Sequence, residues 1–248
     1  GTHTGNSYGD VSLDGAAILS KTGDINIVAA GSKGIMFGLN TADRYNDFGA
    51  CDTTTCPGSL VTATAATVTI NSDLFPTGIT TGSWRSHFKT SGAVTVAPRP
   101  ASNAFAADVT WPSVGATFDV APSSFTFGKA GNTSAVTFGQ SLSVAGPITT
   151  YAGATTINAG LTSTADDISI NASTLTTGAS GTITNSGTSK NVTITADQMT
   201  VGAAISDSSG IVTLQPATVS KAIGLGGIDS STLLGLTDAE IDRVTASK

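Results

Sequence analysis

The chain has 248 residues, a formal net charge of −6 and a pI near 4.6, and only 11% of its residues are charged. A chain of this charge lacks the clustered basic residues that are typical of nucleic-acid-binding domains. No run of apolar residues approaches the roughly 18 that a membrane-spanning helix requires. Glycine occurs 29 times and threonine 41 times. Threonine is β-branched and suits strands, whereas glycine supplies tight turns, so we expect many short strands joined by many corners.

The N-terminal segment from Asp10 to Gly38 contains three stretches of alternating apolar and polar residues between Gly-Asp and Gly-Ser corners. Alternation over three to five residues is typical of strands with one side buried. Residues 40–60 break this pattern with polar, aromatic and turn-forming residues. We therefore predict that they form a loop projecting from a corner.

Two cysteines, Cys51 and Cys56, lie in this loop and enclose four residues. A turn can bring their Cα atoms within the roughly 4.4–6.8 Å that a disulfide requires. We predict a local disulfide and hence an oxidising, extracellular setting; two free thiols or a metal site are the alternatives. Loops on a rigid scaffold often carry function. The same loop therefore offers three possible partner contacts, namely Arg44, Tyr45 and Phe48, unless it packs only on itself.

A second candidate surface follows in "GSWRSHFKTSG", where aromatic and basic residues are neighbours. Such a cluster suits sugar stacking or a protein contact. The alternative is that Trp84 and Phe88 pack inward against an irregular excursion at about 98–122, which contains four prolines. The residues of this cluster and excursion that we predict to contact a partner or glycan are Trp84, Arg85, His87 and Trp111.

From Val136 onward, apolar-polar-apolar triplets recur in coils that each hold two or three short strands. Coils of roughly 18–25 residues with this content are typical of a parallel β-helix, in which stacked coils bury a continuous apolar column. In "AGPITTYAGATTINAGLTS" we expect Ile148, Ile157 and Leu161 to point inward and the threonines to point outward or to face strand edges. One residue of the adjacent pair Asp166 and Asp167 is expected to cap backbone N–H groups at a corner, with a calcium or catalytic role as the alternative.

The chain ends in a different pattern. Thr237 followed three residues later by Glu240 predicts a capping box and a short helix. We therefore expect a β-helix over 1–235, with excursions at about 40–60 and 98–122. Residues 236–248 should form a short helix that caps the stack or joins a following repeat.

Phrases between Trp84 and Lys248 resemble those of large secreted bacterial adhesins related to filamentous haemagglutinin. They include "GKAGNT", "VAGPITTYAGATTIN", "TLQP" and "IGLGG". The resemblance implies an all-β, right-handed parallel β-helix that is secreted, lies at the cell surface or in the extracellular matrix, and is not an enzyme. It implies no catalytic residues, and we expect no cofactor and no metal.

The function that we expect is therefore to span distance and present binding loops in a large adhesin. The partners would be a surface receptor or glycan of a host or neighbouring cell, with no nucleic acid and no membrane insertion in this segment. One alternative is a structural subunit that associates with copies of itself into an extracellular filament, sheath or surface layer. A minor alternative is a polysaccharide-active enzyme, because parallel β-helices also house lyases and hydrolases with clustered acidic residues.

Overall fold

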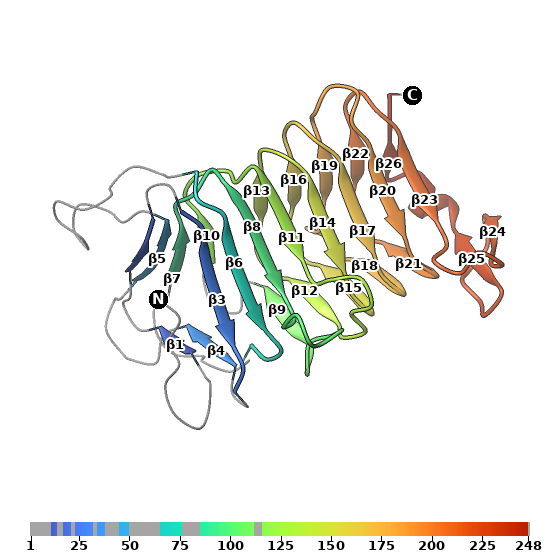
Figure 1. Cartoon of the computed structure of the whole chain (residues 1–248). Coiled ribbons are helices and arrows are strands. Elements are labelled where there is room, and N and C mark those ends of the chain that lie inside the picture. The colour runs from blue at the N-terminus through green and yellow to red at the C-terminus, as the bar shows by residue number, and fades with distance from the viewer. Residues whose placement is uncertain are drawn as a thin grey trace. The chain divides into compact units, whose positions relative to one another are not determined.

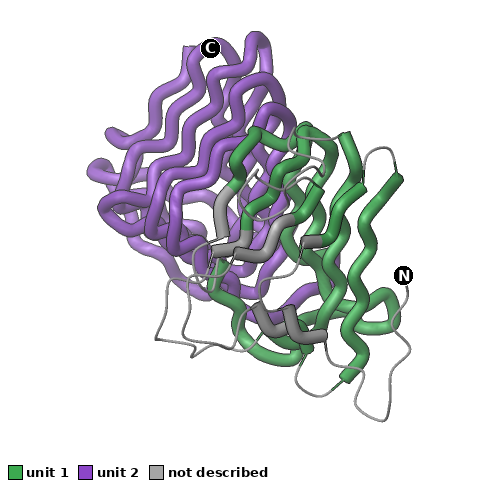
Figure 2. The backbone as a smooth tube through the Cα atoms, turned by 90° about the vertical axis from the view of Figure 1, so that its left-hand side faces the viewer, with its two compact units in different colours: residues 1–129 green, residues 130–248 purple. Residues whose placement is uncertain are grey.

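The structure is a computed structural model, and it divides into two compact units, residues 1–129 and 130–248 (Figure 2). It describes residues 11–13, 17–20, 23–31, 34–37, 45–49, 65–75, 85–111 and 116–247. Within these ranges, only the backbone is described for residues 11–13, 17, 36–37, 45–47, 85–86 and 116–117. Both units are built almost entirely from short parallel strands (Figure 1).

The second unit consists of three parallel ladders, which we name after their first strands. The β14 ladder contains β14 (Ile148–Tyr151), β17 (Ile168–Asn171), β20 (Val192–Thr195) and β23 (Val212–Gln215). The β12 ladder contains β12 (Val136–Phe138), β15 (Ala154–Ile157), β18 (Thr174–Thr177) and β21 (Gln198–Val201). The β13 ladder contains β13 (Leu142–Val144), β16 (Leu161–Ser163), β19 (Ile183–Asn185), β22 (Ile205–Asp207) and β26 (Val244–Thr245).

Successive strands of a ladder pair in register one coil apart. Ile148 pairs with Ile168, which pairs with Val192, which pairs with Val212. The separation of these partners along the chain falls within the range of coil lengths that the sequence predicts. The chain passes through the β12, β13 and β14 ladders in turn before it rises by one coil. The predicted all-β parallel β-helix is therefore confirmed.

The inward side chains form apolar columns. Ile148, Ile157 and Leu161 are fully buried, as predicted. The prediction that the threonines of this stretch point outward is wrong for Thr150 and Thr155, each of which is 1% exposed. In register they pair with residues of the apolar columns, Ile170 and Leu175 respectively. Alternation along the strand, and not the polarity of the side chain, decides which side faces the core.

Corner glycines allow neighbouring coils to approach closely. A Cβ atom at Gly181 would lie 1.9 Å from the carbonyl oxygen of Ile157, and one at Gly210 would lie 1.6 Å from that of Lys190. Real Cβ atoms do not come so near backbone oxygens, so any side chain there would push the coils apart. The high glycine content predicts tight turns. Close packing between coils is a second reason why the chain needs so many glycines.

The first unit has the same construction. One ladder contains β3 (Ile25–Ala29), β6 (Val68–Ser72), β8 (Ala93–Ala97) and β11 (Ser124–Phe127). A second contains β2 (Ala17–Leu19), β5 (Tyr45–Gly49), β7 (Arg85–Phe88) and β10 (Ala116–Phe118). The shorter β1 (Val11–Leu13) pairs with β4 (Ile35–Phe37), and β9 (Val109–Trp111) is a further strand.

Two predicted excursions of this unit contain strands. The loop predicted at 40–60 is wrong over Tyr45–Gly49, because β5 pairs with both β2 and β7. The excursion at 98–122 contains β9 and β10, and β10 pairs with β7. Its first part folds back on the end of β6, because Arg99 donates to the carboxylate of Asp73 from its backbone nitrogen (2.8 Å) and its Nε (2.6 Å).

The last coil of the second unit carries an insert. Ile205 pairs with Val244, whereas the preceding partners in this ladder, Ile183 and Ile205, are only about half as far apart along the chain. The insert contains the parallel pair β24 (Ala222–Leu225) and β25 (Leu233–Leu236) and the predicted helix, α1 (Asp238–Ile241). In Figure 1, β24 and β25 lie beyond the stacked strands at the red end of the chain. Within the described residues, no helix is both long and apolar enough to cross a membrane.

Candidate functional site

Two of the four aromatic residues predicted to contact a partner, Phe48 and Trp111, are core residues. Phe48 is fully buried and stacks on Phe88, with ring centroids 4.9 Å apart. Trp111 is 5% exposed and packs against Phe88 and Phe127 at 5.9 and 5.6 Å. The inward-packing alternative therefore holds for Phe88 and Trp111. As a correction, Phe48 and Trp111 are removed from the candidate contact surface, because buried rings cannot meet an outside partner.

The remaining residues of that prediction are only partly described. Arg44, Trp84 and the predicted disulfide of Cys51 and Cys56 lie outside the described residues. Tyr45 and Arg85 are register partners on β5 and β7, so the fold brings the two predicted segments side by side. This pairing of the two segments was not predicted from the sequence, and the proposed contact role of Tyr45 and Arg85 stays a prediction.

His87 is held by a carboxylate. Its Nδ1 lies 2.8 and 2.9 Å from the two oxygens of Asp119, and Lys89 Nζ lies 3.8 Å from the same carboxylate. An imidazole beside a carboxylate can move a proton. Here, however, two basic side chains converge on one acid near the surface, which is the arrangement of an ion-pair network. Within the described chain, no three of His, Cys, Asp and Glu come together as a metal site.

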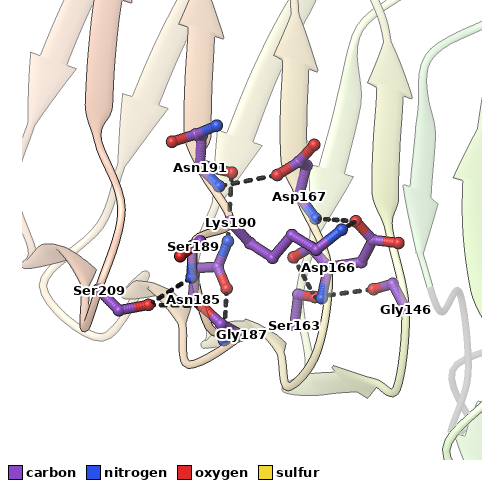
Figure 3. A network of polar contacts seen from close by, with 10 residues as sticks. All are labelled: Gly146, Ser163, Asp166, Asp167, Asn185, Gly187, Ser189, Lys190, Asn191 and Ser209. Carbon is purple, nitrogen blue, oxygen red and sulfur yellow. Dashed lines mark hydrogen bonds and ion pairs between the residues drawn. The ribbon is translucent and has the colours of Figure 1, made fainter.

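The corners between the β13 and β14 ladders are joined by polar contacts that cross from coil to coil (Figure 3). Asp167 accepts a hydrogen bond from the backbone N–H of Asn191 (2.8 Å), and Asn191 Oδ1 accepts one from the N–H of Ile211 (3.0 Å). Lys190 donates to Asp166 at 2.8 Å, and this hydrogen bond lowers the pKa of Asp166. The corner-capping role predicted for one of the two aspartates is therefore confirmed for Asp167.

A buried polar column lies inside the same corners. Ser163, Asn185 and Asp207 are register partners and are 0, 1 and 2% exposed. Each is bonded to its own corner: Ser163 donates to the carbonyl of Asp166 (2.6 Å), and Asn185 donates to that of Asn191 (3.2 Å). Asp207 Oδ1 accepts from the N–H groups of Ser209 and Gly210, but its Oδ2 is buried without a hydrogen bond.

The insert closes one ladder with side chains. Asp229 Oδ2 accepts the backbone N–H of Met199 (2.9 Å), and Glu240 Oε1 accepts that of Val201 (3.1 Å). These alternate N–H groups of β21 are on the side where a further strand would pair. Glu240 also accepts the N–H and hydroxyl of Thr237, which completes the predicted capping box. Two carboxylates thus take the place of the next strand.

The neighbouring ladder has no such cover. β23 is the last strand of the β14 ladder, and in the described chain no strand pairs with its outer edge. Val212 and Leu214 are half-buried, whereas their partners Val192 and Ile194 are fully buried. Six of the seven exposed large apolar side chains among the described residues lie in the same part of the chain: Ile211, Val219, Ile223, Leu225, Ile228 and Ile241.

We name the outer edge of β23 together with these exposed side chains the end surface. Exposed apolar side chains and unpaired strand edges are common features of sites that contact other molecules. Of the arrangements in the described residues, the end surface is the one best suited to contact another molecule.

Comparison with protein-family models, with curated proteins and with solved structures gives no match. The resemblance to secreted adhesins therefore stays a prediction carried by the sequence phrases alone.

The end surface and the polar column are not among the features predicted from the sequence. A signal for the column exists, because Ser163, Asn185 and Asp207 recur at equal intervals along the chain, each at the end of an apolar-polar segment. Glu240 was recognised for its capping box, but nothing local in the sequence connects it to Val201.

Proposed function

We propose that the chain is a non-enzymatic, secreted β-helical segment of a large surface adhesin, which spans distance and presents binding segments. The observation that carries the proposal is the uninterrupted register of the three ladders in the second unit, with corners joined from coil to coil. Stacked repeats of this kind gain stability from each neighbour. A segment so built is suited to hold its insertions at a fixed spacing.

The elements that it would present are its departures from the coil pattern. The insert between β23 and β26 makes the last coil nearly twice as long as the one before it. Tyr45 and Arg85, by contrast, lie in a regular ladder, where β5 pairs with β7. Irregular segments on a rigid scaffold are the usual carriers of recognition. The rest of the predicted loop at 40–60 lies outside the described residues.

A bead-adhesion assay tests this proposal. The purified chain is coupled to fluorescent beads, which are passed under flow over a glycan array and over cultured epithelial cells. We expect chain-coated beads to be retained above the level of albumin-coated beads. Retention no higher than that of albumin, from a chain whose circular dichroism shows intact β structure, would contradict the presenting function.

Extracellular location and the absence of catalysis are parts of the same proposal. Fractionation of the producing cells should place the chain outside the membrane or at the surface. Release of unsaturated or reducing ends from polysaccharides incubated with the chain would favour the enzyme instead.

A further inference from the structure

The insert between β23 and β26 is attached to the preceding coils by its side chains. In the described chain, no backbone–backbone hydrogen bond joins residues 216–242 to the coils of residues 130–215. The two strands of the insert, β24 and β25, pair only with each other. The polar contacts that hold this segment against the coils therefore all involve side chains.

Each of these side-chain hydrogen bonds is accepted by a carboxylate. Near the start of the insert, Thr218 donates its backbone N–H and its hydroxyl to Asp197, which directly precedes β21, both at 2.7 Å. Further along, Asp229 and Glu240 accept the N–H groups of β21 described above. The insert is thus fastened near its start, its middle and its end, and acid can protonate the acceptor at all three points.

Apolar contact adds little to this attachment. Within the insert, β25 packs against β21, and Leu234 and Leu236 of β25 are 0 and 5% exposed. Leu225 and Ile228, by contrast, are 75 and 79% exposed, and Val219 is fully exposed. Two buried leucines and three carboxylates therefore hold the insert against β21.

The coils themselves are held by groups that do not titrate. The backbone N–H groups of Ile148 and Ile168 donate to carbonyls of the next coil at 3.0 and 2.9 Å. The corners also contain Asp166, Asp167 and Asp207, but the backbone ladders remain when these carboxylates are protonated. A hydrogen bond to an ionised carboxylate is about twice as strong as one to a neutral acceptor. Acid should therefore weaken the attachment of the insert before it weakens the stacking of the coils.

Few other charges surround the three carboxylates. The strands β21, β24 and β25 contain no charged residue. Lys221 interacts with Asp197 and Arg243 with Glu240, and both cations favour the ionised form of the carboxylate. The remaining charged residues of the insert are Asp238 and Asp242, in and beside α1.

The pKa directions agree with this arrangement. Hydrogen bonds from Thr218 hold the pKa of Asp197 below its ordinary value of 3.8. Burial raises the pKa of Glu240, but hydrogen bonds from Thr237 and Val201 outweigh burial, and the pKa lies below 4.5. A depressed pKa means that the attachment is complete above the ordinary value and is lost as pH falls through the lower folded value.

We propose that the insert is an acid-released cover of the β12 ladder: protonation of Asp197, Asp229 and Glu240 frees it from β21 while the coils stay stacked. Release leaves the N–H groups of Met199 and Val201 without their acceptors. The chain thus has a strand edge that is closed at neutral pH and open in acid. This inference does not rest on the proposed function, because it uses only contacts within residues 130–248.

Hydrogen–deuterium exchange of the unmodified full chain tests the proposal. Protection factors, which correct for the intrinsic pH dependence of exchange, are measured between about pH 7 and pH 3. The amides of Met199 and Val201 should lose at least about tenfold in protection, whereas those of Ile148 and Ile168 should keep theirs. Protection that persists at all four amides, or that is lost at all four at the same pH, would overturn the proposal.

Matched variants assign the release to the three carboxylates. The triple variant Asp197→Asn, Asp229→Asn and Glu240→Gln keeps the acceptor oxygens but cannot ionise. Its Met199 amide should be less protected than that of the wild type at neutral pH and should show no acid transition.

The control is the double variant Asp238→Asn and Asp242→Asn. In the described chain, the side chains of these two residues form no hydrogen bond with the coils, so this variant should release its insert as the wild type does. A wild-type acid transition at Met199 in the triple variant, or its loss in the control, would overturn the proposal. If the triple variant does not fold, the measurement on the unmodified chain still decides.

Discussion

The carboxylate of Glu240 lies 3.1 Å from the backbone nitrogen of Val201, so a side chain pairs with a strand edge where the next coil would have supplied a carbonyl. Asp229 does the same for Met199 at 2.9 Å. Unpaired edges invite further strands, and hydrogen bonds to an ionised acceptor are stronger than those between neutral groups. The insert therefore covers the last strand of the β12 ladder with two carboxylates. It leaves β23, the last strand of the β14 ladder, without an outer partner strand in the described chain.

Removing this carboxylate should loosen the edge of β21. Glu240→Ala leaves the N–H of Val201 without its acceptor, at a cost of about 1–3 kcal/mol, so its amide should exchange about 5- to 150-fold faster. Hydrogen–deuterium exchange at Val201 checks this, with Asp238→Ala in the same helical turn as the control. Unchanged exchange at Val201 in Glu240→Ala would mean that the carboxylate does not cap the edge.

The same contact should depend on pH. Burial raises the pKa of Glu240, but hydrogen bonds from Thr237 and Val201 outweigh it and hold the pKa below the ordinary value of 4.5. A carboxyl whose pKa is depressed in the folded state stabilises fully above its unfolded pKa, and this contribution is lost as pH falls through the lower folded value. Protection of the Val201 amide should therefore persist above about pH 4.5 and decline in stronger acid. Glu240→Gln should remove this pH dependence; if the variant shows the same acid transition, another group is responsible.

Thr150 offers a stabilising substitution. Its hydroxyl is buried without a hydrogen-bond partner, in register with Ile170 of the apolar column. Thr150→Val keeps the shape and removes an unsatisfied polar group, so the free energy of unfolding should rise by about 1 kcal/mol. Urea denaturation measures the change. Thr149→Val, on the outward side of the same strand, should change stability by less than about 0.5 kcal/mol, and a destabilised Thr150→Val would refute the assignment.

Replacing Asp207 with asparagine should stabilise the protein. The amide of Asn185, one coil earlier, donates to the carbonyl of Asn191 at 3.2 Å, whereas Asp207 Oδ2 has no partner. Asp207→Asn keeps the acceptor for Ser209 and Gly210 and replaces the unpaired carboxylate oxygen with an amide donor, like that of Asn185. We expect a gain of about 1 kcal/mol in unfolding free energy, and a loss for Asp207→Ala. A thermal melt in which the asparagine variant unfolds below the wild type would count against this account of the polar column.

The fold was largely predictable because it depends on the local alternation of apolar and polar residues along each strand. The spacing of short apolar triplets predicted stacked coils, and the pairing of Ile148 with Ile168 and of Ile168 with Val192 agrees with it. Alternation counted from Ile148 would also have placed Thr150 inside, but the polarity of the residue suggested the opposite. The strand β5 could not be predicted, because its polar sequence is held in place by the distant stacking of Phe48 on Phe88.

The candidate site was less predictable because it depends on distant contacts. The aromatic residues Phe48 and Trp111 suggested a recognition surface, yet aromatic rings fill cores as readily as they form surfaces. The end surface arises because an insert covers one ladder edge and leaves the next one open. Whether Ile223 and Leu225 are covered or exposed is decided by the path of the whole last coil, which no local pattern records.

Single-molecule force spectroscopy tests most directly the claim that the second unit is a scaffold of coils joined one to the next. The full chain is stretched between handles attached at its two termini, and the unravelling of residues 130–248 is followed. We predict resisted unravelling in steps that each release one coil, which corresponds to about 70–80 Å of extended chain, or small multiples of it. Extension without force peaks, or steps unrelated to the coil length, would contradict the account.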